Sequence, residues 1–301
     1  MPRRIVRGFT YLITRRCTQR EFLLRPGEET NNAFIYCLAL AAQLCGIDIH
    51  AFVASSNHYH SVITDREGRL PEFLEYFHKL MAKHQNALLD RSENMWSSER
   101  TSVVRLVSTE DALAKLVYTL TNPVKDQLVE KAHHWPGAIS YHACLHGKVL
   151  RATKPKRFFR AGGHLKQEVQ LVCVPLPGYE DDVEGYRRKL AQEIEAVELA
   201  AAQQRARDGS RVIGRRTILT QRPTDRPSSR PLKKGFKPQI AAQDPTLRDQ
   251  ALHELRQFRC TYEVARRQWL VDKAHALPLG TWWLARFAGA KTEPGPLVSD
   301  G

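Results

Sequence analysis

Two histidines within residues 56–63 are separated by a single residue, and this spacing suits a pair of metal ligands. His58 and His60 flank Tyr59, and an apolar run follows them. Side chains two residues apart on a β-strand point to the same face, so both imidazoles would lie side by side while Tyr59 turns into the core. An H-x-H pair is also common as two polar positions on a solvated strand face, and the spacing alone does not separate these interpretations.

Tyr118 and Asn122 stand four residues apart in a segment with helical periodicity, so they share one face of the expected helix. A tyrosine hydroxyl, with an ordinary pKa of about 10, needs an electrophile that a metal polarises. A phosphodiester is such an electrophile, and attack would leave the tyrosine bonded to phosphate. Nitrogens of His58 and His60 with an Asn122 oxygen suit Mg²⁺ or Mn²⁺ better than a closed zinc site. The alternative is an ordinary half-buried helix tyrosine.

The net charge of +14 over 301 residues is the strongest compositional feature. A surplus of this size favours nucleic acid as the partner, an anionic membrane surface second, and a merely soluble basic protein is the alternative. No apolar run of about 18 residues is present, so no transmembrane helix is expected. The N-terminus lacks the features of a signal peptide. Six scattered cysteines without a C-x-x-C pair indicate a reducing compartment and a cytoplasmic protein.

Hydrophobic periodicity predicts an alternation of strands and helices over the first half of the chain. The expected strands cover residues 9–14, 47–53, 58–63 and 102–107, and the expected helices cover 28–45, 72–88 and 109–122. The third helix should end near Asn122, because Pro123 disfavours a helical conformation at the residue before it. This order predicts an α+β fold, with a mostly antiparallel sheet, helices on one face and the other face left free to bind.

The composition changes near Asp181. Helices are expected over residues 186–207 and 246–271, separated by a basic, proline-rich stretch. Prolines within that stretch argue against a helix. Its basic residues are Arg211, Arg215, Arg216, Arg222, Arg226, Arg230, Lys233, Lys234 and Lys237. Two interpretations stay open for the stretch: a solvated linker, or a flexible arm that binds phosphates.

Several segments together resemble the HUH-endonuclease transposases of the IS200-like, single-tyrosine type, especially the REP-associated group. The histidine motif resembles residues 57–60, and the tyrosine motif, a Tyr followed by Asn-Pro and a basic residue, resembles residues 118–125. Weaker likenesses cover residues 11–16, 94–96, 135–136 and 140–141. The resemblance extends over roughly residues 5–145, and the order of the two main motifs makes it fairly specific.

The resemblance implies a ferredoxin-like or RRM-like domain over residues 1–150, followed by a connecting segment, 151–180, and a basic, mainly helical extension, 181–301. It implies Tyr118 as the nucleophile, a metal on His58, His60 and Asn122, and single-stranded or hairpin DNA as substrate. Such an enzyme would work at the bacterial nucleoid as a monomer or homodimer. The residues expected to hold the DNA backbone are Arg15, Arg16, Arg20, Lys79, Lys83 and Lys125.

Two departures from the family pattern affect substrate positioning. The family has Met-Pro before the Asn of the histidine motif, where this chain has Ser55-Ser56, and a basic-small-Gly run where it has Lys125-Asp126-Gln127. Both departures leave the catalytic residues intact. An alternative function is that of a domesticated, catalytically silent relative that binds structured nucleic acid in a regulatory role. A zinc hydrolase is a third possibility, but no H-E-x-x-H motif accompanies the histidine pair.

Overall fold

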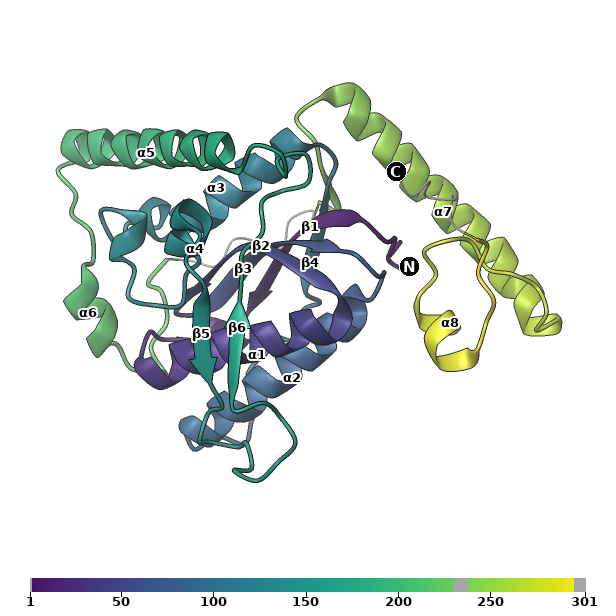
Figure 1. The fold of residues 1–301 in the computed structure, drawn as a ribbon, viewed down its shortest axis with the longest axis horizontal. Coiled ribbons are helices and arrows are strands. Elements are labelled where there is room, and N and C mark those ends of the chain that lie inside the picture. The colour runs from purple at the N-terminus through teal and green to yellow at the C-terminus, as the bar shows by residue number, and fades with distance from the viewer. Residues whose placement is uncertain (1, 230–237, 295–301) are drawn as a thin grey trace.

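The structure of this protein is a computed structural model that describes residues 2–229 and 238–294. Four basic residues of the proline-rich stretch, Arg230, Lys233, Lys234 and Lys237, lie outside the described residues. The architecture is mixed α+β, with one mainly antiparallel sheet and helices around it (Figure 1).

The main sheet has five strands in the order β2-β3-β1-β4-β7. Their bounds are Phe9–Arg16 for β1, Ile47–Ser55 for β2, His58–Asp65 for β3, Ser102–Leu106 for β4 and Ile240–Ala241 for β7. The first four pair antiparallel, and β7 from the C-terminal part adds a short parallel strand beside β4. The predicted hairpin is confirmed, because β2 and β3 are joined by a two-residue turn.

Helices α1 (Glu28–Cys45) and α2 (Leu70–Leu88) cover one face of this sheet. Tyr59 points to this side, as the alternation along its strand predicts, and is 1% exposed. Its ring packs edge-on against Phe34 of α1 and Phe77 of α2, with centroids 5.7 and 5.3 Å away. Because Tyr59 faces these helices, His58 and His60 must face the opposite side of the sheet.

The opposite face is not free, so the expectation of helices on one face only is wrong. Helix α3 (Thr109–Lys125) packs on it, and α5 (Val183–Asp208) packs against α3 (Figure 1). The physical reason lies in the alternating strand residues of this face: Leu12, Val62 and Val104 are apolar and need cover. Polar side chains remain at both ends of this face, with Thr10 and Thr64 at one end and the histidine pair at the other.

Helix α3 also runs further than expected. It begins at a capping box formed by Ser108 and Asp111, and continues past Pro123 to Lys125 instead of ending at Asn122. Proline has no backbone N–H to donate, but the helical turn around Pro123 is still hydrogen-bonded. The Asp126 N–H donates to the Asn122 carbonyl at 3.0 Å, and the Leu128 N–H donates to the Pro123 carbonyl at 2.9 Å. Asn122 therefore keeps helical geometry one turn beyond Tyr118.

The remaining elements lie around this core. They are the 3₁₀ turns at Thr18–Arg20 and Ala132–His134, α4 (Tyr141–His146), the hairpin of β5 (Leu150–Thr153) and β6 (Glu168–Leu171), α6 (Arg215–Thr220), α7 (Pro245–Val271) and α8 (Trp283–Ala288). Tyr186, Leu190 and Ile194 of α5 are buried in one cluster with α3. The division at residues 150 and 180 remains a prediction, and buried contacts cross it. Within the described residues, no helix is both long and apolar enough to cross a membrane.

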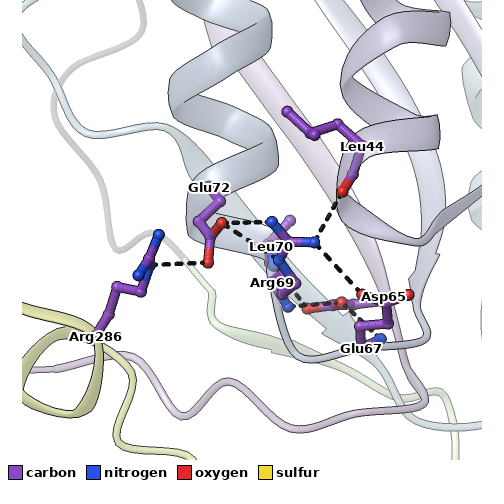
Figure 2. Close-up of polar contacts among 7 residues, drawn as sticks. All are labelled: Leu44, Asp65, Glu67, Arg69, Leu70, Glu72 and Arg286. Carbon is purple, nitrogen blue, oxygen red and sulfur yellow. Dashed lines mark hydrogen bonds and ion pairs between the residues drawn. The ribbon is translucent and has the colours of Figure 1, made fainter. Parts of the chain in front are cut away.

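A polar network ties α8 to the start of α2 (Figure 2). Asp65 at the end of β3 accepts backbone N–H bonds from Arg69 at 2.9 Å and Leu70 at 2.8 Å, which caps α2. The Arg69 guanidinium binds Glu72 at 2.7 Å, and Glu72 also pairs with Arg286 of α8 at 3.4 Å. These contacts attach the C-terminal part to the sheet at the end opposite the histidine pair.

Three buried histidines outside the histidine pair make the fold sensitive to acid. Burial lowers the pKa of His50, His78 and His84 below the ordinary value of 6.5. The unfolded chain therefore binds more protons as the pH falls below about 6.5, and the folded state loses stability. Between pH 7.5 and 5.5 we expect the free energy of unfolding to fall, by at most about 1.4 kcal/mol for each histidine. Urea titrations in the presence of a chelator measure the free energy of unfolding at both pH values. In His78→Gln the fall between the two pH values should be smaller than in the unmodified protein.

Candidate active site

Helix α3 places Tyr118 directly over the histidine pair of β3. The rings of His58 and His60 lie with centroids 4.8 Å apart, and the Tyr118 ring lies 5.2 Å from that of His60. His60 is opposite Thr14 of β1 and Val53 of β2, so the pair lies on an interior strand of the sheet, near the end of that strand. Strand and helix, which are 58 residues apart between His60 and Tyr118, therefore meet at one site.

Asn122 links the components of this site. Its side chain is 3% exposed and accepts a hydrogen bond from the Ser55 hydroxyl, 3.0 Å from Oγ to Oδ1. The Asn122 amide also acts on the pKa of its neighbours: it raises the pKa of His58 and lowers those of Tyr118 and Asp126, in each case against a larger effect of desolvation. The Ser55 hydrogen bond joins the end of β2 to α3 beside the histidine pair.

Both imidazoles are oriented through the same ring nitrogen. His60 Nδ1 lies 2.8 Å from the Thr14 hydroxyl, and His58 Nδ1 lies 2.7 Å from Asn57 Oδ1. The Asn57 oxygen can only accept, so Nδ1 of His58 carries the proton and its Nε2 is left to bind a metal, whereas the Thr14 hydroxyl can hold the His60 ring in either tautomer. Desolvation, with the nearby Arg16 charge, lowers the pKa of His58 to about 4, and desolvation lowers that of His60 well below 6.5. Both rings are neutral at pH 7, as metal ligands must be.

The donor set fits a metal with an incomplete protein shell. Two neutral imidazoles and one amide oxygen leave coordination positions for phosphate or water, which suits Mg²⁺ or Mn²⁺. Among the described residues, no group of three or more His, Cys, Asp and Glu side chains has the geometry to hold a metal ion. The expected set contains only two such side chains, so a bound phosphate would have to supply the missing ligands.

Two lysines flank the Tyr118 ring. The ammonium groups of Lys115 and Lys125 lie 5.9 and 5.2 Å from the ring centroid. Desolvation and the charge of Lys115 lower the pKa of Lys125. Desolvation, followed by the Asp126 carboxylate, raises the pKa of Tyr118. The hydroxyl is therefore protonated at neutral pH, and an anion placed between the two lysines would relieve their repulsion.

The residues expected to bind DNA divide between the two faces of the sheet. Arg16 and Lys125 lie at the site, and the charge of Arg20 reaches His58. Arg15 lies on the opposite face, where its guanidinium binds the Thr101 hydroxyl at 2.6 Å. Lys79 and Lys83 are exposed on α2, also across the sheet from Tyr118. The structure thus brings three of the six basic residues to the site.

Three side chains at the site were not expected from the sequence. They are Ser55, which holds Asn122, and Lys115 and Asp126, which flank Tyr118. Helical spacing could have identified Lys115 and Asp126, since they stand three residues before and eight after Tyr118 and so share its side of α3. Nothing in the sequence alone pairs Ser55 with a residue 67 positions later.

Comparisons with known proteins give partial likenesses. No family profile and no curated protein matches the chain. Two solved structures resemble parts of it. A REP-associated tyrosine transposase bound to a REP hairpin aligns with 47% of this chain and 82% of its own, at 21% identity and a TM-score of 0.38. A provisionally named transposase from Deinococcus radiodurans aligns with 38% of this chain and 92% of its own, at 15% identity and a TM-score of 0.29. Both likenesses are distant, so the chemistry of the site alone carries the functional proposal.

Gln127, just beyond α3, occupies the left-handed backbone region with φ +55°. The resembling family has glycine at the corresponding point of its tyrosine motif, and glycine adopts this conformation without strain. We expect Gln127→Gly to raise the free energy of unfolding by about 0.5–1 kcal/mol, because backbone strain is relieved. Urea denaturation measures the change, with Gln127→Ala, which keeps a Cβ atom, as the matched control. A stabilisation of equal size in both variants would contradict this explanation.

Proposed function

We propose that this chain is a metal-dependent single-stranded DNA endonuclease and strand transferase of the HUH type, with Tyr118 as its nucleophile. The observation that carries the proposal is that the Tyr118 ring lies 5.2 Å from that of His60, between centroids, in a site that also holds the neutral imidazole of His58 and the Asn122 amide. An ordinary helix tyrosine does not require this arrangement. The strand order β2-β3-β1-β4 and the alternation of elements support a ferredoxin-like, RRM-like domain within residues 1–150, with 151–180 connecting it to the extension.

The reaction is a transesterification at phosphorus. The Tyr118 hydroxyl oxygen bonds to the scissile phosphorus, the bond from phosphorus to the 3′ oxygen breaks, and that oxygen leaves with a proton as a 3′-OH. The products are a 5′-phosphotyrosine on the protein and a free 3′-OH strand. The phenolic proton passes to solvent or to a neighbouring base. Because the phosphoester energy is kept, the free 3′-OH of another strand can reverse the step and complete strand transfer.

His58, His60 and Asn122 would hold Mg²⁺ or Mn²⁺ at this site. When bound, the metal polarises the phosphodiester and neutralises charge that develops on its oxygens. The chain's own residues do the rest: Asn122 positions the tyrosine hydroxyl, and Lys115 and Lys125 hold the phosphate beside its ring. Arg16 adds a third positive charge on the same side of the sheet.

The substrate proposed is single-stranded DNA next to a hairpin or imperfect palindrome, at the bacterial nucleoid. The net charge of +14 and the three cations around Tyr118 support a polyanion as the partner. A monomer or a homodimer is compatible with this chemistry, since Tyr118 lies over the histidine pair of its own chain.

A covalent-adduct assay tests the proposal. The protein is incubated with hairpin-flanked single-stranded DNA and Mn²⁺, and the products are separated on a denaturing gel. We expect a slower-migrating protein–DNA species that resists denaturation and is absent in chelator. If DNA binds and no adduct forms under any metal condition, the alternative of a silent nucleic-acid-binding relative replaces the enzyme.

A further inference from the structure

A segment of the C-terminal extension is docked onto the sheet and helix that carry the candidate active site. Residues 211–229, here named the arginine strap, follow α5 and include the short helix α6. At its start, the Ile213 and Gly214 N–H groups donate to the carbonyls of Gln127 and Leu128, both at 2.9 Å. These acceptors directly follow Asp126, so the strap begins at the C-terminal end of α3, which carries Lys125.

The middle of the strap is anchored beneath the site. Ile218 of α6 is 1% exposed and packs in a cluster with Val53 and Val124. Val53 is the cross-strand partner of His60, and Val124 follows Asn122 by two residues. Arg25 donates to the Leu219 carbonyl at 3.0 Å, which holds the end of α6. The strap therefore has a fixed position relative to the histidine pair.

The far end of the strap reaches the other side of the site. Phe22 N–H donates to the Asp225 carbonyl at 3.0 Å, and Arg226 pairs with Glu21 at 2.9 Å. Arg20, whose charge acts on His58, donates to the Ser229 carbonyl at 2.6 Å. The strap thus extends from the tyrosine side of the site to its histidine side.

The strap carries four arginines besides Arg226, which attaches it. Arg211, Arg215, Arg216 and Arg222 are exposed. In the described part of the chain, no ion pair engages these four guanidinium groups, whereas Arg226, which attaches the strap, is paired. Only one acid, Asp225, lies within the strap. Within the described residues, these four exposed arginines therefore leave the docked strap strongly basic.

We propose that the arginine strap binds the sugar-phosphate backbone of single-stranded DNA on one side of the scissile phosphate. Guanidinium groups bind phosphates in a bidentate fashion, and several of them along one docked segment can engage more than one phosphate of a strand. This role of the strap rests on the proposed function, in which a single DNA strand passes Tyr118. The proline-rich stretch would then be a phosphate-binding element held against the site.

Salt-dependent binding tests the proposal on full-length protein. The strap variant changes Arg211, Arg215, Arg216 and Arg222 to glutamine. The control variant changes Arg188, Arg256, Arg266 and Arg267, which are exposed on α5 and α7, and so removes the same charge elsewhere. Both are made in a Tyr118→Phe background, and affinity for a fluorescent single strand is measured from low to high salt. For the strap variant we expect the slope of log affinity against log salt to shrink by about 0.7 per lost contact, roughly 3 in all.

The outcomes separate the strap from the catalytic proposal. Equal losses in both variants, no loss in the strap variant, or no binding by the parent protein would overturn the role of the strap. Oligonucleotides shortened on either side of the scissile position add a second readout: shortening on one side should abolish the difference between strap variant and parent. Adduct formation is followed separately with Tyr118 intact. Binding through the strap without any adduct would refute the enzyme and leave the strap standing.

Discussion

Tyr118→Phe is expected to form no covalent DNA adduct while keeping its fold and its DNA affinity. The substitution removes the only atom that can bond to phosphorus and leaves the ring in place against His60 and the two lysines. Loss of a nucleophile reduces turnover by at least about 10³-fold in enzymes of comparable design. Since Tyr118 is half-buried, removing its hydroxyl should lower the free energy of unfolding by no more than about 1 kcal/mol.

A matched control makes this result specific. Tyr76 is also a half-buried tyrosine on a helix, but it lies on α2, across the sheet from the site. Tyr76→Phe should form adduct at the rate of the unmodified protein. The adduct is counted on a denaturing gel with radiolabelled DNA, and strand affinity is measured in parallel. Adduct formation by Tyr118→Phe at the normal rate would show that another side chain attacks, and the proposed mechanism would be wrong.

The placement of the basic residues at the site could be predicted from the sequence only in part. Arg15 and Arg16 are neighbours on one strand, so only one of them could face the histidine pair. The register of β1 against β3, in which Arg16 is opposite His58, selects Arg16. That register depends on long-range pairing, which the sequence does not reveal.

Lys79 and Lys83 were expected to hold DNA at the site, but they lie on α2, across the sheet from it. Alternation along β3 already predicts Tyr59 in the core and both histidines on the other face. Because α2 packs on the face of Tyr59, every residue of α2 is separated from the histidines by the sheet. The exposed lysines of α2 could therefore have been excluded by combining two correct predictions.

The long-range features of the site could not be predicted from periodicity. Helix α3 on the second face, the Ser55–Asn122 hydrogen bond and the docking of the strap all join segments far apart in sequence. The local features were accessible: the two-residue hairpin, the capping box and the i,i+4 relation of Tyr118 and Asn122 follow from short-range rules. That β3 and α3 meet at one site could be learned only from the three-dimensional fold.

The double variant His58→Ala, His60→Ala is expected to lose Mn²⁺ binding and adduct formation together. Each imidazole would contribute one nitrogen ligand, and loss of either should weaken Mn²⁺ affinity by at least about 10-fold, with a larger loss for both. Isothermal titration with Mn²⁺ alone gives a readout independent of activity. The matched control is His142→Ala, His146→Ala, which removes two exposed histidines one helical turn apart on α4. If the control loses as much affinity, or the double variant at β3 loses none, Mn²⁺ binds elsewhere and the assignment of His58 and His60 fails.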